Sequence, residues 1–186
     1  MVTHQGTETL HTPRLVLRRF TREDVPAMFR NWASDPEVTK YLTWPPHANE
    51  QITAQVVDSW ITDYEKPDFY QWIIVLKGQR PEPIGSISVV EQEDTKAEIG
   101  YCIGKAWWHQ GITSEALQAV MDYLFDQVGM DCLKARHDPR NPHSGNVMKK
   151  CGMKYIDTAF QSDRNNQGIC DACHYALHKS QRSEGQ

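Results

Sequence analysis

The sequence has 186 residues, of which 39% are hydrophobic and 24% charged, with a formal net charge of −4. These values are typical of one soluble globular domain over residues 1–186, with its core at about 10–179 and flexible termini. The small acidic excess argues against a nucleic-acid partner, which would need a basic face. No apolar run approaches the roughly 18 residues that a membrane helix requires, and the first 15 residues lack a signal-peptide pattern.

The five cysteines are scattered and odd in number, which indicates a reducing cytoplasmic location rather than a disulfide framework. Cys170 and Cys173 form a lone CxxC beside His174. A metal site needs more ligands than this, so we predict no metal. We expect the polar first dozen residues and the tail from Ser180 onward to be loose. The sequence leaves open whether the chain forms a homodimer.

The first elements are a strand over 15–20 and two helices. The first helix should begin near Asp24, because Pro26 is tolerated only in a first turn. Asn49 can cap the second helix. Four apolar residues at four-residue spacing then predict its buried face: Ile52, Val56, Trp60 and Tyr64.

Three strand-like runs follow at 70–76, 84–90 and 97–104, and their short polar connections favour antiparallel pairing. A long helix ending near Val128, a strand, a short helix and two last strands complete the chain. This order predicts an α/β (mixed α+β) fold with one mixed, largely antiparallel sheet and helices on both faces.

The run from Ala97 to Val128 predicts a strand, a turn and a helix. The helix has an apolar stripe that should pack on the sheet: Ala116, Leu117, Val120, Met121, Leu124, Phe125 and Val128. Gly111 in the preceding turn permits a close backbone approach. Free N–H groups and the helix dipole would make this turn an anion site suited to pyrophosphate. Alternatively, Gly111 merely opens a tight turn and Ser114 caps the helix.

The segment AEIGYCIGKAWWHQGITSEAL resembles the central acyl-CoA motif of the GNAT superfamily, in the branch of the ribosomal-protein N-terminal acetyltransferases. The segments TPRLVLR, DPEVTKYLTW, PIGSISV and NPHSGNVMKKCGM extend the resemblance over nearly the whole chain. It implies the GNAT fold, with about seven strands, and acetyl-CoA as cosubstrate. Trp108 and Thr113 depart from the frequent turn pattern, although Thr113 still supplies its backbone amide.

The resemblance also implies the residues that hold acetyl-CoA. The turn would bind its phosphates through backbone groups of His109, Gln110, Gly111, Ile112, Thr113 and Ser114. The strand would hold its pantetheine arm through Tyr101, Cys102 and Ile103. Asn141, which by itself reads as a helix N-cap before Pro142, would add a hydrogen bond to the same arm. Cys102 lacks an evident His or Asn partner, so we interpret it as a packing residue.

Two residues are the candidates for catalysis. Glu98 lies in an otherwise apolar strand, where a carboxylate is costly unless it is paired, hydrated or functional. It could be an exposed edge residue, but the resemblance implies a general base, because an ammonium must lose a proton before it attacks a thioester. Many relatives protonate the leaving thiolate with a tyrosine where this chain has Met148. Ser144 is therefore the candidate for that role, directly or through water.

The acceptor should contact aromatic residues of the first helices and loops: Trp32, Tyr41, Trp44 and Tyr70, with Pro45 beside them. Each aromatic could equally belong to the edge of the core. We predict acetyl transfer to a primary amine, either a protein N-terminus or a small amine such as a polyamine, amino acid or drug. A non-catalytic acyl-CoA-binding module and a nucleotide enzyme that uses the Gly111 turn are the alternatives.

Overall fold

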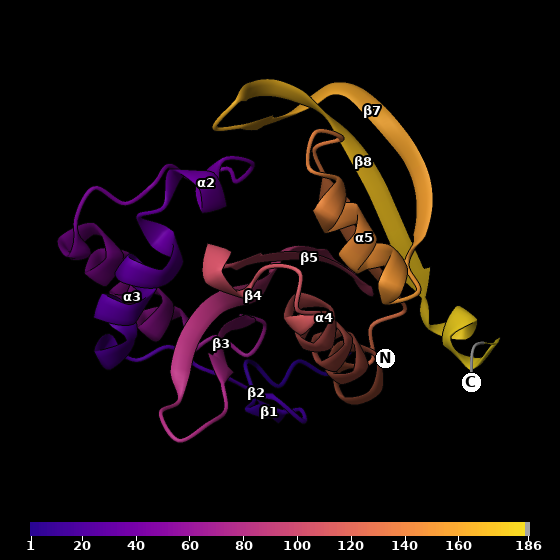
Figure 1. Cartoon of the computed structure of the whole chain (residues 1–186). Coiled ribbons are helices and arrows are strands. Elements are labelled where there is room, and N and C mark those ends of the chain that lie inside the picture. The colour runs from indigo at the N-terminus through magenta and orange to yellow at the C-terminus, as the bar shows by residue number, and fades with distance from the viewer. Residues whose placement is uncertain (185–186) are drawn as a thin grey trace.

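One eight-stranded sheet organises residues 1–184, the part of the chain that the computed structural model describes (Figure 1). Its strands lie in the order β1-β2-β3-β4-β5-β6-β8-β7. Only the β5–β6 pair is parallel, so the predicted mixed, largely antiparallel sheet is confirmed. The strands are β1 (Leu10–His11), β2 (Leu15–Arg18), β3 (Gln71–Leu76), β4 (Glu82–Glu93), β5 (Lys96–Ile103), β6 (Cys132–His137), β7 (Lys154–Asn165) and β8 (Gly168–His178).

Two apolar cores cover the two faces of this sheet, because successive side chains of a strand point to opposite faces. Trp72 and Ile74 of β3 belong to the core under α4 (Ile112–Tyr123). Ile73 and Val75 belong to the core that α1 (Val25–Met28) and α3 (Glu50–Asp63) cover. The central strand β3 is therefore buried on both faces, which explains its nearly unbroken apolar run.

The remaining helical segments are short. They are 3-10 turns at Arg22–Asp24, Lys105–Trp107 and Lys179–Glu184, π-helical turns at Phe29–Ala33 and Leu124–Val128, α2 (Pro36–Thr39) and α5 (Pro142–Lys150). The apolar stripe of the long helix is buried as predicted. Gly152, with φ of +79°, ends α5 as expected. Asn141 occupies the N-cap position of α5 and Pro142 the first helical position, as predicted, but the Asn141 side chain makes no capping hydrogen bond.

The first two helices begin where the sequence predicted. Pro26 lies in the first turn of α1, and the Asn49 side chain accepts a hydrogen bond from the Ile52 N–H at 3.0 Å. The buried face of α3 differs from the prediction, because Ile52 is 38% exposed while Val57 is fully buried. Residues four apart drift around a helix of 3.6 residues per turn, so a strict four-residue spacing leaves the buried face.

The first dozen residues are packed rather than loose, which corrects the expectation. The Thr3 N–H donates to the Val128 carbonyl at 2.8 Å, and the buried Thr7 hydroxyl donates to Phe69 and accepts from the Gln71 N–H. Polar side chains here satisfy backbone groups of the sheet, which composition alone does not reveal. In the tail, Arg182 forms ion pairs with α4 and its extension, while residues 185–186 lie outside the described part. Within residues 1–184, no helix combines the length and apolarity needed to cross a membrane.

Strands β5 and β6 diverge soon after they meet. They pair in parallel only from Lys96 to Glu98 and from Cys132 to Lys134. Beyond this point β6 pairs with β8 alone, so the later half of β5 has one free edge. The opening lies at the carboxyl ends of two parallel strands, where α/β proteins generally bind their ligands.

We expect Gly85→Ala to destabilise the fold by about 1–3 kcal/mol, because an added Cβ would overlap the neighbouring strand. That atom would lie 2.4 Å from the Cys102 carbonyl oxygen and 2.9 Å from Ile103 Cα, and neither backbone atom can rotate away. Gly78→Ala is the control, since a Cβ there meets nothing within 4 Å. Denaturant unfolding measures both variants, and equal midpoints would contradict the prediction.

Candidate active site

Two cavities open where β5 and β6 diverge. The carboxylate cavity, of about 430 Å³, contains Glu98 and lies between the first helices and the β6–β8 region. The turn cavity, of about 340 Å³, lies beside Gly111 and the beginnings of α4 and α5. Residues common to both linings are Tyr41, Leu42, Tyr101, Cys102, Asn141 and Ser144. Molecules bound in the two cavities would therefore meet at this junction.

The beginning of α4 presents unpaired backbone donors to the turn cavity. The first helical hydrogen bond runs from the Glu115 N–H to the Gly111 carbonyl, at 3.2 Å. The N–H groups of residues 112–114 consequently have no acceptor within the helix. Gly111 has φ of +71° and His109 has φ of +61°, both in the left-handed region. Every residue predicted for this turn, from 109 to 114, lines the cavity, and the free N–H groups together with the helix dipole suit an anion.

The turn is held against the beginning of the chain by a partly buried carboxylate. Glu115 accepts hydrogen bonds from the Thr12 hydroxyl at 2.5 Å, the Arg14 N–H at 2.9 Å and Arg14 Nε at 2.6 Å. Burial opposes ionisation, but these hydrogen bonds hold the pKa of Glu115 below its usual range. Arg14 Nη1 also donates to the Gln110 carbonyl at 2.9 Å. The turn is thus fixed before any ligand arrives.

One face of α5 also lines the turn cavity, and the sequence reasoning missed it. Its residues are His143, Asn146, Val147 and Lys150. The last three lie three, four and seven residues after His143, which places all four on one helical face. This spacing is the sequence pattern from which the face could have been predicted. The Lys150 Nζ atom lies 3.3 Å from where a Cβ on Gly111 would stand, so its positive charge adjoins the turn. The ring centroids of His109 and His143 lie 4.6 Å apart.

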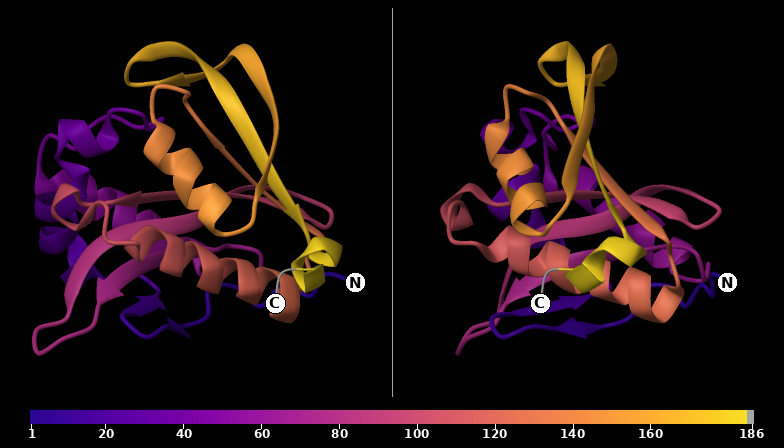
Figure 2. Two further views of the ribbon diagram at one scale, coloured as in Figure 1. Left: turned by 45° about the vertical axis from the view of Figure 1, so that its right-hand side comes forward. Right: turned by 90° about the vertical axis from the view of Figure 1, so that its right-hand side faces the viewer.

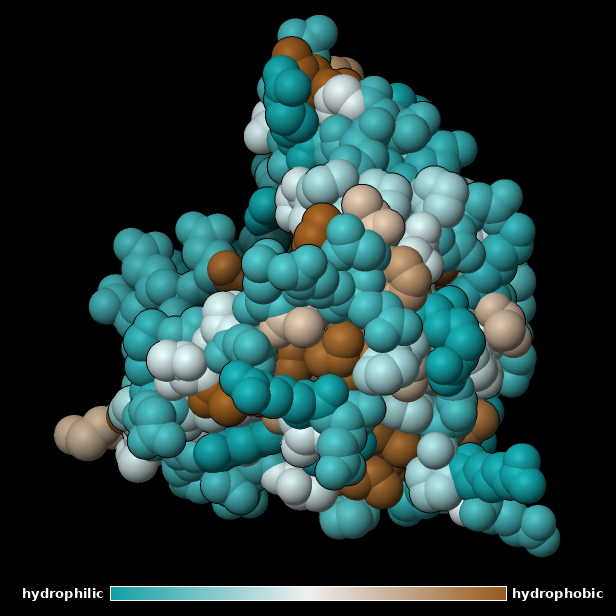
Figure 3. Space-filling model, turned by 90° about the vertical axis from the view of Figure 1, so that its left-hand side faces the viewer, coloured by the Kyte–Doolittle hydropathy of each residue, from teal (hydrophilic) through white to brown (hydrophobic). Residues whose placement is uncertain are grey.

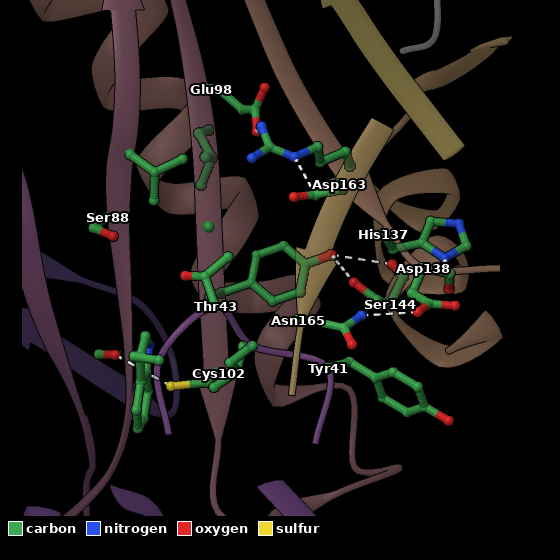
Figure 4. A pocket seen from close by; sticks show the side chains of 18 of the residues that line it. Tyr41, Thr43, Ser88, Glu98, Cys102, His137, Asp138, Ser144, Asp163 and Asn165 are labelled. Carbon is green, nitrogen blue, oxygen red and sulfur yellow. Dashed lines mark hydrogen bonds and ion pairs between the residues drawn. The ribbon is translucent and has the colours of Figure 1, made fainter. Parts of the chain in front are cut away.

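A pair of hydroxyl groups occupies the junction of the cavities. The Ser144 hydroxyl donates to the Tyr101 hydroxyl at 3.2 Å, and Tyr101 donates to the Ser144 carbonyl at 3.0 Å (Figure 4). Burial raises the pKa of Tyr101 well above its usual value, so this phenol stays protonated. The Met148 side chain is buried in the core under α4. The Cys102 Sγ atom lies 3.3 Å from the Ser86 hydroxyl, and burial raises the pKa of its thiol.

Glu98 faces the carboxylate cavity and belongs to a three-residue ion-pair cluster. Arg136 Nη1 pairs with Glu98, and Arg136 Nε donates to Asp163 Oδ2 at 2.8 Å. Figure 4 shows Glu98 and Asp163 on either side of one guanidinium group. The Glu98 side chain is only 14% exposed, so it is not a free edge residue. Burial raises its pKa, with Arg136 opposing, so this carboxylate is more basic than an ordinary one.

The aromatic residues predicted for the acceptor divide into two groups. Tyr41 and Trp44 line the carboxylate cavity. Trp32 is fully buried in the core under α1 and α3, and Tyr70 lies under α4, where its hydroxyl bonds His4 Nδ1 at 2.9 Å. Neither Trp32, Tyr70 nor Pro45 lines the cavity, and the full burial of Trp32 and Tyr70 contradicts their predicted contact with an acceptor there. An aromatic side chain fits a core as well as a pocket wall, and residue type alone does not decide.

The two cysteines of the CxxC segment contact different residues. The Cys170 Sγ atom contacts Asn165, whereas that of Cys173 contacts the Thr158 hydroxyl, each at 3.3 Å. Residues three apart in a strand point to opposite faces, which separates the two thiols. Over residues 1–184, no group of three or more His, Cys, Asp or Glu side chains is placed to hold a metal ion.

Comparison with known proteins places this geometry in context. The family model described as the acetyltransferase (GNAT) domain matches residues 14–154. A Bacillus licheniformis protein named uncharacterized N-acetyltransferase p20 is 33% identical over 139 residues, which are 74% of this chain and 77% of that protein.

Two solved structures share the fold. A GNAT-family acetyltransferase from Bacillus anthracis has a TM-score of 0.81 at 24% identity, covering 93% of this chain and 99% of that one. RimL, described as the ribosomal L7/L12 α-N-protein acetyltransferase and solved in complex with coenzyme A, has a TM-score of 0.80 at 22% identity. That match covers 92% of this chain and 98% of RimL. At these identities the likeness concerns the fold alone.

We expect Gly111→Val to weaken coenzyme A binding by at least about tenfold, or 1.4 kcal/mol, because a β-branched residue resists the left-handed conformation of the turn. Gly152→Val is the matched control, since Gly152 has φ of +79° and does not line the turn cavity. Both variants should lose folding stability, but only the first should lose affinity in calorimetric titration. Unchanged affinity in Gly111→Val would refute the phosphate-turn assignment.

Lys150→Gln should weaken coenzyme A binding by about 1.5–3 kcal/mol, the usual contribution of a hydrogen bond to a charged group. The loss should shrink as the salt concentration rises, because salt screens the attraction. The neighbouring Lys149 does not line the cavity, which makes Lys149→Gln the control. Titrations at two ionic strengths measure both variants, and equal losses would show that only net charge matters.

Proposed function

This chain belongs to the GNAT family of acetyltransferases, and on that premise we propose that it transfers acetyl from acetyl-CoA to a primary amine by direct attack in a ternary complex. The observation that carries the proposal is the meeting of two cavities along β5. One contains a turn whose free backbone N–H groups suit an anion, and the other contains a carboxylate whose pKa is raised by burial. A cofactor and an acceptor bound in these cavities would come into contact at Cys102 and Ser144.

Acetyl-CoA fits the turn cavity as a cosubstrate. Its pyrophosphate would accept hydrogen bonds from the N–H groups of residues 112–114, with Lys150 adding positive charge. The amide groups of its pantetheine arm would pair with the edge of β5 that β6 leaves free, at Cys102 and Ile103. The Asn141 side chain, which makes no hydrogen bond to the described residues, would add a further partner. The thioester then lies at the junction.

Glu98 would accept the proton of the acceptor ammonium, which leaves the nitrogen lone pair free to attack the thioester carbon. Cys102 lies four residue steps along β5 from Glu98, or about 13 Å between Cα atoms. The carboxylate would therefore act through ordered water rather than by contact with the thioester. Arg136 and Asp163 would position it. As the carbon–sulfur bond breaks, the Ser144 hydroxyl would donate a hydrogen bond to the departing thiolate.

The acceptor is either a protein N-terminus or a small amine, and the alternatives are a non-catalytic acyl-CoA-binding module and a nucleotide enzyme. An acceptor screen with acetyl-CoA that follows release of the free thiol separates them. Turnover with any amine supports the proposal. Binding of acetyl-CoA without turnover would support the module. Greater thermal stabilisation by ATP than by acetyl-CoA would support the nucleotide enzyme.

Glu98→Gln should lower kcat/KM by about 10²–10⁴, the usual contribution of general-base catalysis. Because burial raises the pKa of Glu98, wild-type activity should fall with decreasing pH at a higher pH than an ordinary carboxylate would allow. With an acceptor whose amine is already neutral, this fall in activity at low pH reports Glu98 rather than the titration of the amine. Glu98→Gln should abolish that pH dependence.

Glu93 provides the control, since it is exposed on β4, lies opposite Lys96 and does not contribute to the raised pKa of Glu98. Glu93→Gln should keep both the wild-type rate and the wild-type fall in activity at low pH. A pH profile and rate in Glu98→Gln that match those of the wild type would exclude this residue as the base.

A further inference from the structure

An asparagine at the end of the β7–β8 hairpin joins the two sides of the carboxylate cavity. The Asn166 side-chain amide donates to the carbonyls of Thr39 and Trp44, each at 2.8 Å. Its backbone N–H donates to the Leu42 carbonyl at 3.2 Å. The three acceptors all lie in the segment that ends α2 and follows it. We refer to these three hydrogen bonds as the Asn166 bridge.

The end of the hairpin is itself fixed, although the hairpin extends well beyond the rest of the molecule (Figure 2). The Asn165 side chain donates to Asp138 Oδ2 at 2.8 Å, and its own oxygen accepts from the Gln167 N–H at 2.8 Å. Asp138 is buried, and hydrogen bonds from Arg140 hold its pKa far below the usual range. Asn165 thus anchors the hairpin to the end of β6, and Asn166 reaches the opposite side.

The bridge spans the cavity because each side contributes to its lining. The segment after α2 supplies Tyr41, Leu42, Thr43 and Trp44, and the hairpin supplies Asp163, Arg164 and Asn165. Strands β4 and β5 form the floor between them, through Ser88 and Gly100. A volume of about 430 Å³ lies within the 300–1,000 Å³ of cavities that enclose small ligands.

The surface beside α2 and α3 offers little for a polypeptide. This face is mostly hydrophilic, and its apolar residues appear in separate small groups (Figure 3). A stable protein partner would need about 800 Å² of complementary surface with an apolar centre. A polypeptide acceptor that entered between the hairpin and residues 39–44 would have to break the Asn166 bridge.

Building on the proposed function, we infer that the acceptor is a small amine enclosed beneath the Asn166 bridge, and that Asn166 is a positioning residue for it. The ammonium group would lie toward Glu98 and Asp163. The carbon skeleton would lie against Trp44 and Trp60, which line the same cavity. A protein N-terminus is then a poor acceptor.

The first test compares Asn166→Ala with Gln167→Ala in the full chain. Gln167 lies in the same turn and makes no hydrogen bond to residues 39–44. With benzylamine, phenethylamine or spermidine as acceptor, Asn166→Ala should raise the acceptor KM by about tenfold, because the enclosing segment must be ordered at each binding event. The KM for acetyl-CoA and the kcat should stay near wild type. Asn166→Asp, which faces two carbonyls without a donor, should behave like Asn166→Ala.

Thermal melts confirm that each variant is folded, and Gln167→Ala should match the wild type in every measurement. If Asn166→Ala matches Gln167→Ala in acceptor KM, the positioning role is refuted. If kcat falls in Asn166→Ala while the KM values for the acceptor and for acetyl-CoA both rise, the residue supports the fold in general, which also refutes the positioning role.

The second test compares the same amines with Ser- or Ala-initiated dipeptides and decapeptides. The best small amine should exceed the decapeptides in kcat/KM by about a hundredfold, within the range that enzymes reach by differential binding. Asn166→Ala should narrow that ratio. Decapeptides that react as well as the small amines would overturn this inference and leave the proposed function intact. Turnover with neither class, while acetyl-CoA binds, would overturn the proposed function and this inference with it.

Discussion

The divergence of β5 from β6 is the constraint on which both cavities depend. Pairing between these strands ends at Glu98 and Lys134, which leaves one edge of β5 without a neighbouring strand. Backbone groups inside a protein need hydrogen-bond partners, so an open edge at the centre of a sheet favours a ligand that carries amide groups. The pantetheine arm of the proposed cofactor has such groups. The same divergence separates the sheet enough for β6, β7 and β8 to form the far wall of the carboxylate cavity.

Side chains alternate between the two faces of β5, so neighbouring residues of this strand contact different parts of the molecule. Ala97, Ile99 and Ile103 are buried in the core under α4. Glu98 and Cys102 point the other way, toward the carboxylate cavity. One strand therefore fixes the core, the proposed base and the junction at once. A shift of register by one residue would exchange these faces, which ties the chemistry of the site to the packing of the core.

Local patterns predicted the strand, the turn and the long helix, because their signals are apolar periodicity and a glycine within a single segment. The partners of Glu98 could not be predicted in this way. Arg136 and Asp163 lie on strands that meet β5 only through the fold, and Asn166 reaches across from the distant hairpin. Trp32 and Tyr70 were assigned wrongly because an aromatic residue suits a core and a pocket equally well. The face that such a residue occupies is decided by tertiary packing.

The junction of the cavities favours direct transfer over a covalent acyl-enzyme. An acyl-enzyme would need a nucleophile with an adjacent base where the two bound molecules meet. Cys102 is the thiol among the residues that line both cavities, and burial raises its pKa. Within residues 1–184, the Ser86 hydroxyl is the one group at hydrogen-bond distance from its sulfur. Ser144 interacts with a phenol that stays protonated and therefore cannot take up its proton. With neither nucleophile activated, the geometry supports the proposed direct attack by the amine, and the meeting of the cavities at Tyr41 and Leu42 would allow both substrates to be bound together.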